Sequence, residues 1–124
     1  MRIVAIALLF SYTTCFAGEA DVLSAEVEHS GGNYYHIKVT VKHNDENWDH
    51  FAASWEVLDQ DGNILGVRVL RHPHIREQPF TRELTVEIPD HIENITIRAY
   101  DLIHHYGGKE FTLKIKKGNN DEVK

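Results

Sequence analysis

The fold is decided most clearly by Tyr34-Tyr35-His36-Ile37-Lys38-Val39-Thr40-Val41-Lys42, the stretch YYHIKVTVK at residues 34–42. Its apolar side chains alternate with polar ones, which is the two-residue period of a strand with one buried face. The preceding residues 30–33 are Ser-Gly-Gly-Asn, and glycine and asparagine tolerate the positive φ of a turn. Residues 21–29 alternate in the same way. The sequence therefore predicts two strands joined by a tight turn.

Five further strands follow the same logic. They are expected at residues 51–58, 64–71, 80–88, 95–99 and 111–115, separated by a hairpin at 59–63, a Pro-Asp stop at 89–90 and a loop at 102–108. Seven short strands without a convincing helix predict an all-β fold, a seven-stranded antiparallel Greek-key sandwich of the immunoglobulin or fibronectin type III kind. Trp55 lies on the third strand, where such sandwiches often bury a tryptophan. This architecture predicts no function.

The amino-terminal residues predict export. A charged start, the apolar run Ile3–Phe10 and small residues up to Ala17 are typical of a signal peptide at 1–17, with cleavage after residue 20 as the alternative. Lipidation at Cys15 is a weaker alternative, because aliphatic and small residues do not precede that cysteine. We expect one sandwich domain at 21–117, a disordered tail at 118–124, a periplasmic or secreted monomer, and no membrane span after cleavage.

Composition restricts the chemistry. Cys15 is the only cysteine and Met1 the only methionine, so a mature chain offers no thiolate or thioether to a metal and forms no disulfide. The net charge of −6 argues against nucleic-acid binding. Nine histidines are many for 124 residues. Any metal site is expected to consist of imidazole and carboxylate groups.

Most of the histidines are expected at one end of the sandwich. If successive strands run antiparallel, the connections after the second, fourth and sixth strands share an end. These connections carry six of the nine histidines: His43, His50, His72, His74, His104 and His105. Imidazole is the commonest protein ligand for Zn(II) and Cu(II). This end is therefore the predicted functional surface.

The stiff segment His72-Pro73-His74 supplies the first candidate ligands. In an extended segment, side chains two residues apart point the same way, so His72 and His74 could reach one ion together. His104 or His50 would complete the set, and Asp49 and Glu77 are the expected auxiliary groups. His43 and His105 are further candidates. The alternative is that all of these are polar loop residues that hydrogen-bond the backbone.

Two other functions remain open at the same loops. A metal-free module could bind a periplasmic protein through Trp48, Tyr106 and Arg76, because aromatic residues are enriched at binding hot spots. Hydrolysis by a zinc-bound water is the third possibility. Nucleophilic catalysis is disfavoured, since Ser54 lies on a strand without the sharp turn of a serine nucleophile. No catalytic residue is predicted.

A family resemblance points to the same setting. Trp48-Asp49-His50, His72-Pro73-His74 and Glu77-Gln78-Pro79-Phe80-Thr81-Arg82 form the pattern W-D-H … H-P-H-x-x-E-Q-P-F-T-R, with His104 and Tyr106-Gly107 following. This pattern resembles a family of small exported bacterial β-sandwich proteins without a defined activity. The resemblance implies a bacterial, periplasmic protein with a sandwich domain, and it transfers no catalytic residue.

Overall fold

The computed structural model describes residues 18–115, which form seven strands. In chain order they are β1 (Asp21–Gly31), β2 (Tyr34–Lys42), β3 (Ala52–Leu58), β4 (Ile64–Val69), β5 (Phe80–Glu87), β6 (Asn94–Asp101) and β7 (Phe111–Lys114). Within residues 18–115 there is no helix that could cross a membrane. The all-β prediction is confirmed, and each predicted strand begins and ends within two residues of the observed one. The predicted signal peptide and tail lie outside the described residues.

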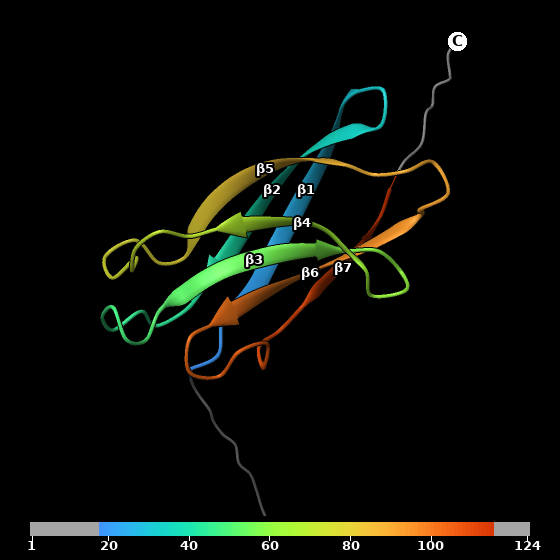
Figure 1. Ribbon diagram of the computed structural model, residues 1–124. Helices are drawn as coiled ribbons and strands as arrows, with labels where there is room; N and C mark the ends of the chain where they lie inside the picture. The colour runs from blue at the N-terminus through green and yellow to red at the C-terminus, as the bar shows by residue number, and fades with distance from the viewer. Residues whose placement is uncertain (1–17, 116–124) are drawn as a thin grey trace, which may run out of the picture.

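The strands form two antiparallel sheets (Figure 1). One has the order β1-β2-β5, and the other has the order β4-β3-β6-β7. The stretch at 34–42 is the central strand of the smaller sheet, where Tyr35 pairs with Val86 and Val41 with Phe80. A central strand has its backbone hydrogen-bonded on both sides, which explains why its pattern is the most regular in the chain.

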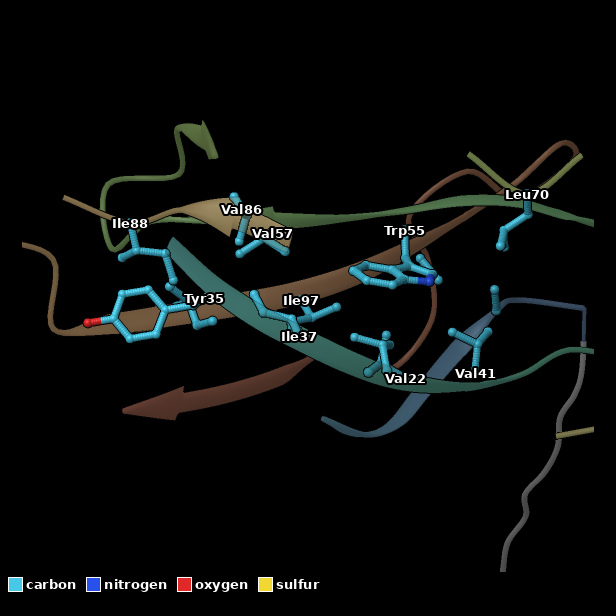
Figure 2. Close-up of a cluster of buried hydrophobic side chains, with 14 of the residues drawn as sticks. Val22, Tyr35, Ile37, Val41, Trp55, Val57, Leu70, Val86, Ile88 and Ile97 are labelled. Atoms are coloured by element: carbon cyan, nitrogen blue, oxygen red, sulfur yellow. The ribbon is translucent and has the colours of Figure 1, made fainter. Parts of the chain in front are cut away.

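The core lies between the sheets. Ile37, Val39 and Val41 on β2 are fully buried, and they face Trp55 and Val57 on β3. Figure 2 shows the Trp55 ring above Val22 and Val41. Burying each such side chain stabilises the fold by about 1.5–3 kcal/mol. The core therefore fixes the relative position of the two sheets, and with it the position of the loops at their ends.

Three connections meet at one end of the sandwich. They are the β2–β3 connection (43–51), the β4–β5 connection (70–79) and the β6–β7 connection (102–110), all at the left and lower left of Figure 1. The chain enters the domain beside them, because the carbonyl of Gly18 contacts residues of two of these loops. This arrangement brings together groups that are 86 residues apart.

Candidate metal centre

Three imidazole nitrogens surround one carboxylate oxygen at this end. Asp101 Oδ2 lies 2.7 Å from His43 Nε2, 3.0 Å from His50 Nε2 and 3.1 Å from His104 Nδ1. The ligand atoms of His43, His50 and Asp101 all lie within 4.8 Å of one another, as the ligands of one metal ion must. The packing of the two sheets determines this convergence, because Asp101 ends β6 in one sheet and His43 directly follows β2 in the other.

A backbone oxygen faces the same three nitrogens. The carbonyl oxygen of Gly18 lies 2.8 Å from His43 Nε2, 3.3 Å from His50 Nε2 and 2.9 Å from His104 Nδ1. Three nitrogens and two oxygens thus form one compact group. Every oxygen in it is a hydrogen-bond acceptor unless the carboxyl group is protonated.

His43 has acceptors on both sides of its ring. Its Nδ1 contacts Asp45 Oδ1, and its Nε2 contacts Asp101 and the Gly18 carbonyl. The side chains of all three residues His43, Asp45 and Asp101 are fully buried. Burial lowers the pKa of His43, but the hydrogen bonds with Asp45 and Asp101 raise it by more, so the net pKa lies above the ordinary 6.5.

His50 repeats this arrangement nearer the surface. Its Nδ1 lies 2.8 Å from Glu46 Oε1 and its Nε2 lies 3.0 Å from Asp101 Oδ2. Burial lowers the pKa of His50, and the contacts with Glu46 and Asp101 raise it by more. Both imidazoles are therefore held with one nitrogen toward Asp101 and the other toward a separate carboxylate.

Asp101 is held as a charged group. The backbone N–H groups of Ile103 and His104 donate to its Oδ1 at 2.6 and 3.2 Å, which leaves Oδ2 to the imidazoles. Burial raises the pKa of Asp101, but the hydrogen bonds from Ile103, His104 and His43 lower it by more, to well below its ordinary value. The carboxylate is thus ionised and available as a metal ligand at any physiological pH.

Asp45 joins the loops that carry the site. Its Oδ1 accepts the N–H of Ala52 at 3.1 Å, and its Oδ2 accepts the N–H of His74 at 2.6 Å. Gln78 adds a second link, since its Oε1 accepts the His43 N–H at 2.9 Å and its Nε2 donates to the His74 carbonyl at 2.8 Å. The loop at 70–79 therefore fixes His43 from outside the cluster.

A second network holds the loop of His104. Tyr106 O–H donates to Glu56 Oε2 at 3.0 Å, and Arg98 pairs with Glu56 Oε1 at 2.7 Å. The Arg98 guanidinium lies 3.8 Å from the centre of the Tyr106 ring, which is a cation–π contact. Tyr106 is thus anchored to the outer face of the β3–β6 pair, and the loop that carries His104 is held against the sheet.

The structure separates the predicted ligands into two groups. His43, His50 and His104 converge on Asp101, whereas His72 and His74 do not join that cluster. The ring of His74 is buried and stacks on Phe80 with a centroid distance of 4.2 Å. The His72 ring lies 4.8 Å from that of His74, and its Nδ1 lies 3.2 Å from the Pro73 carbonyl oxygen. The predicted pairing of His72 and His74 with His104 is therefore not the geometry of the site.

The remaining predicted residues lie around the cluster. His105 has a φ of 59° and stacks on Tyr100, away from Asp101 Oδ2. Asp49, which was expected to support a histidine ligand, is exposed. The carboxylates that contact His43 and His50 are instead Asp45 and Glu46. Glu77 accepts hydrogen bonds from Arg82, at 3.0 Å for the shorter one, and so braces its own loop. The expected partner residues Trp48, Tyr106 and Arg76 are all exposed at the loop end.

Asp101 and Gly18 are the site groups that sequence reasoning did not select as ligands. Asp101 precedes His104 by three residues at a strand end, and this spacing is the signal that could have found it. Gly18 contributes only a backbone oxygen. No side chain marks such a group in a sequence.

No protein-family model matches the sequence. A Halomicrobium mukohataei protein named "Putative lipoprotein" is 34% identical over 100 residues, which is 81% of this chain and 49% of that protein. The chain thus spans about half the length of the curated relative it matches.

The fold is shared with a superoxide reductase. The superoxide reductase (neelaredoxin) from Ignicoccus hospitalis superposes with a TM-score of 0.51 at 15% identity, covering 79% of this chain and 81% of that chain. At this identity the likeness shows the β architecture alone.

Proposed function

We propose that this domain binds a divalent transition-metal ion through His43, His50 and Asp101, with His104 as a further imidazole ligand. One observation carries the proposal: both ring nitrogens of His43 and both of His50 face oxygen atoms that accept hydrogen bonds. A neutral imidazole has one N–H donor and one lone pair, so it cannot satisfy acceptors on both sides. Without an ion, each ring satisfies both acceptors only when it is protonated, whereas a cation bound at the two Nε2 atoms satisfies them with neutral rings.

The groups behind the ligands support this assignment. With an ion at Nε2, Nδ1–H of His43 donates to Asp45 and Nδ1–H of His50 donates to Glu46. Metal-bound histidines commonly donate their second N–H to a carboxylate, which fixes the tautomer and makes the ligand nitrogen more basic. Two adjacent rings with this arrangement are better explained by one shared ion than by two independent hydrogen-bonding patterns.

Charge gives a second line of support. Asp45 and Asp101 are both buried, and an unpaired buried carboxylate costs several kcal/mol. A divalent cation between His43, His50 and Asp101 balances these two negative charges without requiring that the histidines be protonated. The two buried carboxylates are then neutralised above the pH range in which free imidazole loses its proton, and the third carboxylate, Glu46, is exposed to solvent.

The donor set favours borderline metal ions. Residues 18–115 contain no cysteine or methionine, so the ligands are nitrogen and oxygen, which suit Zn(II) and Cu(II). We expect Cu(II) to bind more tightly than Zn(II). Two histidines with one carboxylate are also a set that holds Fe(II) with open positions.

The Fe(II) option supports a second candidate function. The structural neighbour is named a superoxide reductase, and His104 is 38% exposed, so one side of the cluster reaches solvent. If Fe(II) were bound, it would supply one electron per superoxide and become Fe(III), and two protons taken up from solvent would complete the product, hydrogen peroxide. Stopped-flow decay of superoxide with the Fe(II)-loaded chain tests this reaction. Decay no faster than with the Zn(II)-loaded chain would exclude it.

The metal proposal is tested by titration calorimetry of the chelator-treated chain with Zn(II) and Cu(II). We expect one ion per chain in the wild type and in a His72→Ala/His74→Ala variant, but no stoichiometric binding in His43→Ala/His50→Ala. His36→Ala is the matched control, because His36 lies on the outer face of β2 beside Glu83. Binding that survives in His43→Ala/His50→Ala would contradict the proposal.

A metal-free interaction module remains the alternative. Trp48, Ile75 and Ile103 are each more than half exposed and come from the three connections at the site end. Exposed apolar groups on neighbouring loops are typical of a protein-binding surface, to which Tyr106 and Arg76 would contribute polar contacts. If no ion binds the wild type, crosslinking through residue 48 in intact cells tests this function.

We also propose an exported, envelope-associated protein, and the relative's name supports export. A periplasmic location, a monomeric state and membership of the family with the W-D-H … H-P-H pattern are proposed on the sequence alone. The sheet orders β1-β2-β5 and β4-β3-β6-β7 are consistent with a Greek-key sandwich of the fibronectin type III kind, which we propose as the finer fold class.

A further inference from the structure

We infer that the backbone carbonyl of Gly18 is a metal ligand, so the segment through which the chain enters the domain completes the site. This inference rests on the proposed metal binding at His43, His50 and Asp101. It adds a ligand from a part of the chain that contributes no side chain to the cluster.

The distances carry the inference. Each of the three imidazole nitrogens lies between 2.7 and 3.1 Å from Asp101 Oδ2. Each also lies between 2.8 and 3.3 Å from the Gly18 oxygen. Two ligand atoms at right angles around an ion, each about 2.1 Å from it, are about 3.0 Å apart. All six nitrogen–oxygen distances are close to this value.

One coordination geometry accounts for all six distances. In a trigonal bipyramid, each axial ligand makes a right angle with all three equatorial ligands. Placing the nitrogens of His43, His50 and His104 in the equatorial plane puts Asp101 Oδ2 and the Gly18 oxygen at the two axial positions. In this arrangement the Gly18 oxygen would lie opposite the carboxylate.

The position requires glycine. Gly18 has a φ of +144°, which side chains disfavour, and a Cβ atom at residue 18 would overlap the His104 ring. The absence of a side chain allows the backbone to approach the imidazole closely. Gly31 provides a matched comparison, since its φ of +131° is similar and nothing lies within 4 Å of a Cβ there.

The inference has a consequence for export. Removal of a signal peptide after Ala17 would keep Gly18 and its carbonyl, whereas cleavage after Ala20 would remove that ligand. Ala20 is also 1% exposed and belongs to the core. Metal binding would hold the residues that directly follow the predicted cleavage site against the domain.

Carbon-13 NMR of the full chain tests the inference directly. The chain is labelled with glycine enriched at the carbonyl carbon, loaded with Co(II), and compared with the Zn(II) form. The sequence contains eight glycines, and the Gly18 signal is assigned by its loss in Gly18→Ala. Coordination delivers unpaired spin density to the carbonyl carbon through bonds, so the Gly18 shift should keep a large contact part after the through-space part has been subtracted. An uncoordinated carbonyl at the same place would show the through-space part alone.

Affinity gives the second readout. We expect Gly18→Ala to weaken Zn(II) binding by about 10- to 100-fold, and Gly31→Ala to leave it unchanged. If the wild type binds no ion, the proposed function fails. If it binds Zn(II) but the through-space part explains the whole Gly18 carbonyl shift in the Co(II) form, the inference is overturned, and any loss of affinity in Gly18→Ala reflects displacement of His104.

Discussion

Replacing Asp45 by alanine should damage both stability and metal binding. The Asp45 carboxylate accepts hydrogen bonds from Ala52 N–H and His74 N–H, and it contacts His43 Nδ1. Its side chain is fully buried, so water cannot replace it. Leaving three buried donors without a partner, at about 1–2 kcal/mol each, lowers the free energy of unfolding by about 3–6 kcal/mol.

The same change should weaken metal binding without removing a ligand. Asp45 holds Nδ1–H of His43, so its loss frees the ring to rotate and to change tautomer. Loss of such a carboxylate commonly costs about 10- to 100-fold in metal affinity. Chelator competition with Zn(II) measures this effect, and urea unfolding in EDTA measures the stability. Asp45→Asn keeps one carbonyl acceptor and provides a variant for affinity measurements if the alanine variant does not fold.

Asp49→Ala is the control for Asp45. Asp49 lies in the same connection but is exposed, so its removal should change stability by less than about 0.5 kcal/mol. Zn(II) affinity should stay at the wild-type value. Equal effects of Asp45→Ala and Asp49→Ala on both quantities would refute the role of Asp45 as the buried group that orients His43.

Three further outcomes are expected. The pKa values of His43 and His50 are raised above 6.5 in the metal-free fold, so their protonated forms contribute stability that is complete below pH 6.5. This stability is lost as pH rises through the raised values, so the urea midpoint in EDTA should fall as pH rises above 6.5. With Zn(II) bound, the urea midpoint should instead rise with pH, since protons compete with the ion for Nε2. In EDTA, a urea midpoint that does not change with pH would argue against the raised pKa values of the two histidines. Tyr106→Phe should cost about 1 kcal/mol and speed amide exchange at residues 102–108, because the hydrogen bond to Glu56 is lost; unchanged exchange would show that Glu56 does not hold this loop. His105→Gly should keep Zn(II) affinity, because the ring stacks on Tyr100 and glycine accepts a φ of 59°; a tenfold loss would place His105 in the site.

The fold was predictable because its signals are local. The alternation of apolar and polar side chains at residues 34–42 identifies the central strand. The glycine-containing turns at 30–33 and 59–63 mark where neighbouring strands end and begin. Antiparallel succession then assigns connections to ends without coordinates. This reasoning placed six histidines at one end of the molecule, and the three that converge on Asp101 are among them.

The proposed ligand set was not predictable, because it depends on which way each side chain points. The spacing of two residues in an extended segment suggested that His72 and His74 bind one ion together. In the structure, the His74 ring instead stacks on Phe80 and is buried. His50 meets Asp101 because β3 pairs with β6, and the two residues are 51 apart in the chain. His43 meets Asp101, 58 residues away, because the two sheets pack against each other. The Gly18 carbonyl has no signature in the sequence.

The most direct test of the central claim is a crystal structure of the Zn(II)-loaded chain, with diffraction measured on both sides of the zinc absorption edge. We expect one anomalous peak per chain, about 2.0–2.2 Å from His43 Nε2, His50 Nε2 and Asp101 Oδ2. A peak at His72 and His74 instead, or no peak at the loop end, would contradict it.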